Sequence, residues 1–175
     1  GLMATGGSTN LMIHILAMAR SIGYEMNLED IAELSQVTPL LARIYPNGSA
    51  DVNQFHAAGG MAFVIRELLA ANLLHADALS VIGKPISAYA YEPSLAQGHL
   101  YWKDAPVTSG DENILRSTAT PFSSQGGLCR LHGNLGESVI KISALDESKW
   151  KVSAPARVFD SQQAMARAHK AGELT

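Results

Sequence analysis

The sequence lacks several features that mark common protein classes. Its single cysteine, Cys129, excludes an internal disulfide framework and any metal site built only from cysteines of this chain. The 13 Lys and Arg residues do not outnumber the 16 Asp and Glu residues, so neither a nucleic-acid surface nor a polybasic membrane anchor is expected. No apolar run reaches the roughly 18 residues of a membrane span, because His14 interrupts the longest run and Arg20 closes it.

Charged residues are also scarce. They make up 17% of the chain, whereas roughly 25% is usual for a soluble domain. The hydrophobic content of 47% excludes intrinsic disorder, so a folded chain with this composition is expected to bury part of its surface against something else. The start at Gly1-Leu2-Met3, without a signal peptide, and the sparse cysteine then predict a cytoplasmic piece of a larger protein.

Apolar residues recur at helical spacing in four stretches, three of them in the first half of the chain. The third stretch contains Gly59-Gly60, a pair that predicts a break or a close backbone contact, because glycine is unfavourable inside a helix. The expected helices run from a cap at Ser8 or Thr9 to Gly23, over 28–37, over 52–74, and from a cap at Asp160 or Ser161 to Gly172.

Short apolar or alternating runs predict strands, mostly in the second half. Between them, residues 89–122 show no periodicity, and so long a stretch with little regular structure is uncommon inside one domain. We therefore expect this segment to be a functional loop or the crossing between two domains. The expected strands are 79–82, which is expected to be buried, and 128–131, 139–144 and 157–159.

The turn formed by Gly6, Gly7, Ser8, Thr9 and Asn10 is the most suggestive local motif. Backbone amides, hydroxyls and the start of a helix together can bind anions or hydroxylated ligands. The turn has neither the lysine of a P-loop nor the spacing of a dinucleotide fingerprint, so a nucleotide is not expected. Helix capping alone also explains these residue types, so an ordinary capped turn remains open.

The other polar candidates are weaker. None of the six histidines has the spacing of a metal site, but His14 interrupts an apolar helix face and His56 lies beside the Gly59-Gly60 break. Taken singly, each of the two fits a hydrogen-bonded structural role better than a site role. The remaining residues are expected to be structural, with Cys129 a small buried apolar residue and Arg66-Glu67 and Asp111-Glu112 solvated charges.

Five strings occur in an order that points to one family. They are Ala-Thr-Gly-Gly-Ser-Thr-Asn at 4–10, Asp-Val-Asn-Gln-Phe-His-Ala-Ala-Gly-Gly-Met at 51–61, Gly-Gly-Leu at 126–128, Gly-Asn-Leu-Gly at 133–136 and Pro-Ala-Arg-Val-Phe-Asp-Ser at 155–161. Together they resemble the dihydroxy-acid dehydratase / 6-phosphogluconate dehydratase family. Within it, Tyr-Pro-Asn-Gly at 45–48, the run at 55–60 and the long segment 89–122 look like the 6-phosphogluconate branch.

The resemblance implies a cytoplasmic hydro-lyase that converts 6-phospho-D-gluconate into 2-dehydro-3-deoxy-6-phosphogluconate and water, in Entner–Doudoroff sugar-acid catabolism. It implies an iron–sulfur cluster, of the 4Fe–4S type, acting as a Lewis acid, possible use of Mg²⁺, and a homodimer. Cys129 does not match a cluster cysteine, so cluster ligands, metal ligands and catalytic residues are expected outside this fragment, which alone would be inactive. The substrate-side residues carried over from the family are Gly6, Gly7, Ser8, Thr9, Asn10 and His56.

The resemblance also implies an α/β fold in two parts. Residues 1–122 would finish the α/β N-terminal domain, including the crossing at 89–122, and residues 123–175 would begin a β-barrel-like C-terminal domain. Two alternatives remain open. One is the same fold acting on a dihydroxy acid or an unphosphorylated sugar acid, which a phosphate-dependent activity would distinguish. The other is a non-catalytic anion-binding module, which iron-independent ligand binding would favour.

Overall fold

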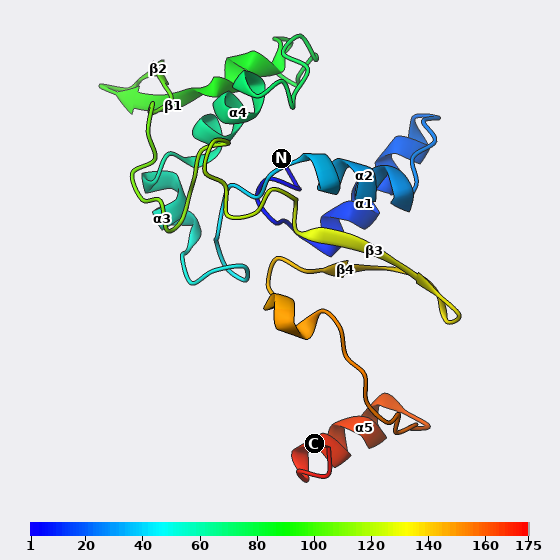
Figure 1. The fold of residues 1–175 in the computed structure, drawn as a ribbon. Helices are drawn as coiled ribbons and strands as arrows, with labels where there is room; N and C mark the ends of the chain where they lie inside the picture. The colour runs from blue at the N-terminus through cyan, green and yellow to red at the C-terminus, as the bar shows by residue number, and fades with distance from the viewer. Residues whose placement is uncertain (175) are drawn as a thin grey trace.

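The computed structural model describes residues 1–174 as an α/β chain of helices and two antiparallel hairpins (Figure 1). No closed barrel is present among these residues, since each sheet has two strands. None of the described helices is long and apolar enough to cross a membrane. The elements are α1 (Thr9–Ser21), α2 (Leu28–Val37), α3 (Val52–Ala57), α4 (Gly60–Ala70), η1 (Ile86–Ala90), β1 (Tyr91–Ala96), β2 (His99–Asp104), β3 (Leu128–Gly133), β4 (Gly136–Lys141), η2 (Glu147–Lys149) and α5 (Gln162–Lys170).

Four of the five described α-helices begin at a side chain that satisfies free backbone amides, whereas α4 begins at Gly59 without such a cap. Ser8 caps α1 by accepting a hydrogen bond of 3.1 Å from the Asn10 amide. Asn27 and Asp30 form a reciprocal capping box at the start of α2, and Ser161 caps α5. The bounds of α2 agree with the prediction, because caps and the following proline act locally.

The predicted third helix is divided into α3 and α4. Gly59 has a φ of +132°, which side-chain-bearing residues rarely adopt, and a Cβ there would lie 2.9 Å from the Cβ of Phe63. The glycine pair therefore produces the expected break, and it also allows a close contact. The helix ends at Ala70 rather than near residue 74, and Asn72 beyond it has a positive φ of 56°.

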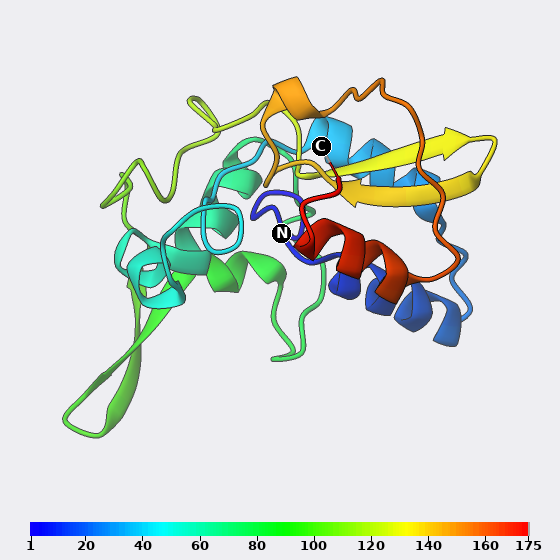
Figure 2. The ribbon, with the colours of Figure 1, turned by 90° about the horizontal axis from the view of Figure 1, so that it is seen from below.

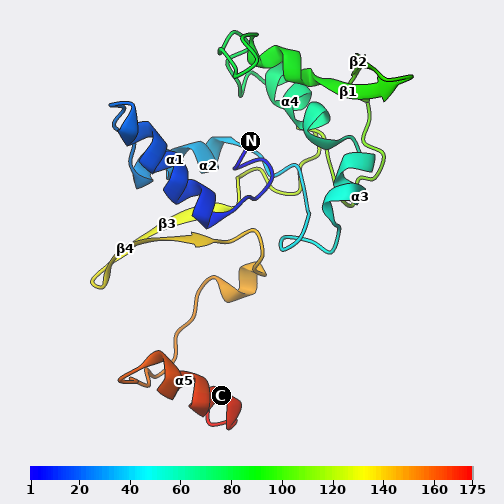
Figure 3. The ribbon, with the colours of Figure 1, turned by 180° about the vertical axis from the view of Figure 1, so that it is seen from behind.

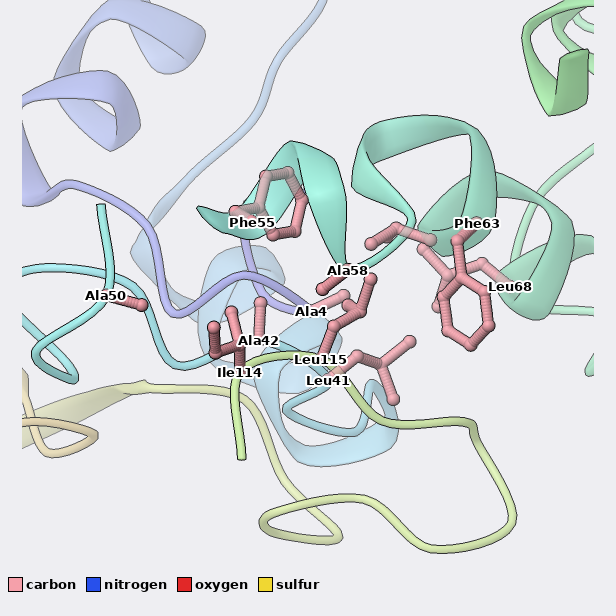
Figure 4. Packing of buried hydrophobic residues seen from close by; sticks show 11 residues of the cluster. Ala4, Leu41, Ala42, Ala50, Phe55, Ala58, Phe63, Leu68, Ile114 and Leu115 are labelled. Atoms are coloured by element: carbon pink, nitrogen blue, oxygen red, sulfur yellow. The ribbon is translucent and has the colours of Figure 1, made fainter. Parts of the chain in front are cut away.

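Two clusters of buried apolar residues hold the fold together. In the first, Phe63 and Leu68 of α4 pack against Leu41 and Leu115 from two extended segments (Figure 4). These segments form an isolated antiparallel bridge between Ala42 and Leu115. The second cluster lies where β3 packs along α2 and β4 approaches α1. Its buried members are Met3, Met12, Ile31 and Leu128.

Two predicted strands are wrong. Residues 79–82 form a turn in which the Ser80 amide donates to the Lys84 carbonyl, and Val81 is 98% exposed. Residues 157–159 have no strand partner among the described residues, and Val158 is 88% exposed. Apolar composition alone misled the prediction, because a strand also needs a neighbouring strand to receive its hydrogen bonds.

The segment 89–122 has more regular structure than expected. Its first part forms the β1–β2 hairpin, which extends outward from α4 (Figure 2). Gln97 and Gly98 both have positive φ, as a two-residue hairpin turn requires. Pro93 and the polar residues Glu92 and Ser94 on the half-buried face of β1 hide the alternating pattern that would have predicted the strands. The prediction of little regular structure is therefore wrong for the hairpin.

The β-rich second half consists of one hairpin followed by a long exposed segment. β3 and β4 pair antiparallel from Leu128–Lys141 to Gly133–Gly136, close to the two strands expected there. Beyond them, α5 stands apart from the other helices (Figures 1 and 3). Ala168 is the one buried residue among 143–174.

Candidate functional site

The glycine-rich turn before α1 closes on itself. Gly6 has a φ of +62° and is buried, and its amide donates to the Met3 carbonyl at 3.1 Å. The Gly7 amide donates to the Leu2 carbonyl at 2.9 Å. Both amides are therefore engaged inside the turn. The expectation that they are free ligand donors is wrong, because a tight turn satisfies its own backbone groups.

The residues after the two glycines offer the polar groups of this loop. Ser8 and Asn10 are exposed, and Thr9 is half-buried. The amides of Thr9 and Leu11, in the first turn of α1, have no acceptor among residues 1–174. The helix start thus presents amide donors beside the Ser8 hydroxyl, a combination suited to an oxyanion or a hydroxylated ligand.

Asn47 fixes the position of the loop. Its Nδ2 donates to the carbonyls of Gly6 at 2.8 Å and Thr5 at 3.2 Å, and its Oδ1 accepts from the Ser143 hydroxyl at 3.0 Å. One side chain therefore joins the loop to the chain just beyond β4. In the sequence, Asn47 stood out only as part of the family string at 45–48, and no pattern pointed to Ser143.

The second glycine pair lies against the same loop. A Cβ on Gly127 would collide with the Ser143 side chain and lie 3.2 Å from the Gly6 Cα. A Cβ on Gly126 would lie 2.9 Å from Met3 Cβ and Ser35 Oγ. Three of the strings quoted above, at 4–10, 45–48 and 126–128, thus meet at one place. Glycine is needed there because two backbone segments approach closely.

A cavity of about 270 Å³ adjoins this meeting point. It lies between the extended segment at Leu40 and the chain that follows β4, and both Gly126 and Ser143 line it. Its volume approaches the lower end for small-molecule sites. The Asp146 carboxyl on its wall has a lowered pKa, because the side chain and amide of Ser148 donate hydrogen bonds to it. The charged and polar lining residues are Arg43, Ser123, Gln125, Ser143, Asp146 and Glu147.

His56 lies in a different part of the fold. It is on α3, with a 68% exposed side chain, and its Nε2 is 3.3 Å from Glu92 Oε1 on β1. Lys103 of β2 approaches the other oxygen of Glu92, also at 3.3 Å. The described residues that line the cavity do not include His56. The structure therefore brings the glycine loop, Asn47 and Ser143 together, and leaves His56 at the base of the β1–β2 hairpin.

The remaining candidates differ in their surroundings. His14 is exposed on α1, and Cys129 is half-buried in β3, so Cys129 is less enclosed than expected. Glu67 is not the solvated charge that was predicted. It pairs with Arg66 at 3.0 Å and accepts a 3.0 Å hydrogen bond from the Thr118 amide. Within the described chain, no three His, Cys, Asp or Glu side chains are grouped to hold a metal ion.

Comparison with known proteins extends over nearly the whole chain. The chain is 51% identical over 173 residues to a phosphogluconate dehydratase of Pseudomonas aeruginosa, and the match covers 99% of this chain and 28% of that protein. A phosphogluconate dehydratase of Zymomonas mobilis is also 51% identical, over 175 residues, covering 99% and 29%. A dihydroxy-acid dehydratase of Koribacter versatilis is 39% identical over 160 residues, covering 91% and 26%.

The chain spans less than a third of the length of these relatives. Two family models match it in succession. The dihydroxy-acid/6-phosphogluconate dehydratase N-terminal model matches residues 1–89, and the C-terminal model of the same description matches residues 113–175. The β1–β2 hairpin falls between the two matched ranges. The chain thus belongs to the dihydroxy-acid/6-phosphogluconate dehydratase family.

Proposed function

We propose that this chain is a segment of a hydro-lyase that dehydrates 6-phospho-D-gluconate to 2-dehydro-3-deoxy-6-phosphogluconate, as in the Entner–Doudoroff route. The observation that carries the proposal is the 51% identity to proteins named phosphogluconate dehydratase over 99% of the chain. The named dihydroxy-acid dehydratase is less similar, at 39% over 91% of the chain. The identity therefore favours the phosphorylated sugar acid as the substrate.

In this enzyme the loop Gly6, Gly7, Ser8, Thr9 and Asn10 lines the substrate side of the site. Its glycines shape the turn, and the exposed Ser8 hydroxyl and the Thr9 amide supply hydrogen bonds to substrate oxygens. Asn47 and Ser143 hold the loop at the edge of the cavity. These groups bind and orient the substrate, which lowers the entropic cost of reaching the reactive geometry.

His56 is a second substrate-side proposal, carried by its place in the family string at 51–61. Its exposed imidazole next to Glu92 can exchange a proton or a hydrogen bond with a ligand, because the carboxylate orients the ring. It does not line the cavity within the described chain, so it would contact a substrate only from the side of the β1–β2 hairpin.

The iron–sulfur cluster and the Mg²⁺ implied by the family do not fit the residues present here. Cluster iron is usually held by several cysteine thiolates, whereas this chain has one cysteine, half-buried in β3. The described residues also contain no group of three potential metal ligands. We therefore assign both to residues outside this segment, and no role of the loop or the cavity depends on them.

The β3–β4 hairpin would begin a β-rich C-terminal domain, with the domain boundary near residue 122, and the full-length enzyme would be a cytoplasmic homodimer. The exposed area supports further packing. The described chain exposes 12246 Å², whereas a compact monomer of 18.6 kDa would expose about 8,200 Å². The remainder of the enzyme and a second copy are the surfaces proposed to cover the difference.

The test is to assay the full-length enzyme that carries this segment. Formation of the 2-keto product is measured with 6-phosphogluconate, with gluconate and with a short 2,3-dihydroxy acid. We expect turnover to be most efficient with 6-phosphogluconate. A preference for the dihydroxy acid or for gluconate would replace the proposed substrate within the same family. No turnover of any of the three, by enzyme with its cofactors restored, would favour a non-catalytic binding module.

A further inference from the structure

Arg43 and Arg116 differ from Arg66 and Arg130 in the partners of their guanidinium groups. Arg66 and Arg130 form ion pairs with carboxylates. Arg43 and Arg116 form none among residues 1–174 and instead both stack on Phe122. Their guanidinium carbons lie 4.6 Å and 4.3 Å from the ring centroid. Two like charges thus share one aromatic ring without an acidic partner.

The backbone places these two side chains together. Ala42 and Leu115 form the antiparallel bridge, in which the Arg43 amide donates to the Ile114 carbonyl and the Arg116 amide donates to the Leu41 carbonyl, both at 2.8 Å. In such a pairing, residues 43 and 116 are diagonal neighbours on the same face. They therefore lie on the face opposite to Ala42 and Leu115, where Arg43 is exposed and Arg116 is half-buried.

Phe122 is held against this face by its own backbone. Its amide donates to the Leu40 carbonyl at 2.9 Å, and Leu40 in turn pairs with Ser123. The ring orients both guanidinium groups by cation–π attraction, which uses their faces and leaves N–H donors at their edges. The Nε of Arg116 donates to the Glu112 carbonyl at 2.8 Å, which leaves the two terminal nitrogens to bind a ligand.

The cavity provides room beside Arg43 and the Phe122 ring, whereas Arg116 is not among the described residues that line it. Arg43 and Phe122 line it, together with Ser123, Gln125 and Ser143. Asp146 and Glu147 line it as well, and neither pairs with Arg43 within the described chain. One part of the lining is therefore cationic and another is acidic. A ligand with an anionic end and a chain of hydroxyls matches both, since carboxylates accept hydrogen bonds from hydroxyls and repel an anion.

We propose that Arg43 and Arg116, oriented by Phe122, form the subsite for the phosphate group of the substrate. This inference rests on the proposed function, because it names the part of the segment that recognises the phosphorylated end. A guanidinium group binds phosphate through parallel hydrogen bonds, which lysine cannot form in the same way. Asp146 and Glu147 would accept hydrogen bonds from the sugar hydroxyls and keep the phosphate on the arginine side.

The experiment compares substitutions in the full-length enzyme. Arg43→Gln, Arg116→Gln and the double variant are assayed with 6-phosphogluconate and with gluconate. We expect KM for 6-phosphogluconate to rise about 10- to 100-fold in the double variant, while kcat/KM for gluconate stays within about twofold of wild type. Arg43→Lys keeps the charge without the planar group and should lose part of this affinity. Arg20→Gln is the matched control, at an exposed arginine in the last turn of α1 that has no ion-pair partner among residues 1–174.

Binding of inorganic phosphate provides a readout that does not depend on turnover. Calorimetry should detect competition between phosphate and 6-phosphogluconate in wild type and in Arg20→Gln, and weaker phosphate binding in the double variant. An unchanged KM and unchanged phosphate binding in a folded double variant would overturn the subsite, even if wild type is a phosphogluconate dehydratase. A wild-type enzyme that does not dehydrate 6-phosphogluconate would overturn the proposed function, and phosphate binding alone would then decide whether the arginine pair is an anion site.

Discussion

Residues 1–74 and residues 144–174 differ in how far tertiary packing adds to local interactions. Both regions contain a helix capped by a serine, at Ser8 for α1 and Ser161 for α5. The first region also supplies most of the main apolar cluster, whereas the second contributes the buried Ala168 and no other buried residue that is described. Local hydrogen bonds are thus enough to place a helix, but burial requires a partner surface within the same chain.

The largest effect is expected from removing a side chain of the core. Phe63 is 1% exposed and packs between α4 and the extended segments. Phe63→Ala should lower the free energy of unfolding by about 3–5 kcal/mol, because it removes apolar contacts and leaves a cavity. Urea denaturation of the full-length enzyme measures this loss.

Val158→Ala is the matched apolar truncation in the second region, where the side chain is 88% exposed. It should change the free energy of unfolding by less than about 0.5 kcal/mol. A loss above about 1 kcal/mol would contradict the exposure of this segment, because residues outside the described chain would then have to pack against it.

A smaller loss is expected where the first region meets the β3–β4 hairpin. A methyl group on Gly127 would collide with the Ser143 side chain and crowd the Gly6 backbone. Gly127→Ala should therefore cost about 1–3 kcal/mol of stability, because overpacking forces the backbone to shift. Gly133→Ala is the control, since a Cβ there meets no atom within 4 Å. Equal melting temperatures for the two variants would show that the glycine contact is loose.

The difference between local and tertiary interactions also explains which parts of the fold could be predicted. The bounds of α2 and the break between α3 and α4 followed from caps, a proline and paired glycines, which act over a few residues. The predictions of strands at 79–82 and 157–159 were wrong because strand pairing depends on tertiary structure, not on residue types within the segment. Apolar composition does not show whether a partner exists.

The candidate site was predictable only in part, for the same reason. The glycine loop could be recognised from its residue types and from the family strings. Its contacts could not, because Asn47 and Ser143 are 96 residues apart in sequence. The stacking of Arg43 and Arg116 on Phe122 is likewise a product of the extended pairing around Leu41. No periodic pattern records such contacts between side chains.

The two serine caps can separate structural from functional roles. Ser8→Ala and Ser161→Ala each remove one acceptor for a helix amide, so each should cost about 1 kcal/mol of stability. Only Ser8 belongs to the proposed substrate-side loop. Ser8→Ala should therefore also lower transition-state stabilisation by about 1–3 kcal/mol, measured as kcat/KM of the full-length enzyme. Equal kcat/KM values for the two variants would leave the loop as a helix cap only.

The smallest effect is expected in the exposed second region, where a contact is purely local. The Ser148 side chain and amide donate to Asp146 at 2.5 Å and 2.9 Å, and these hydrogen bonds lower the pKa of the carboxyl. A carboxyl with a lowered folded-state pKa contributes stability that is present above its unfolded pKa and is lost as pH falls through the folded value. Ser148→Ala removes the larger cause, so the pKa of Asp146 should rise toward its ordinary value. Carboxyl NMR titration measures the midpoint, with Ser153→Ala as an exposed control, and an unshifted midpoint in Ser148→Ala would show that solvent already screens this contact.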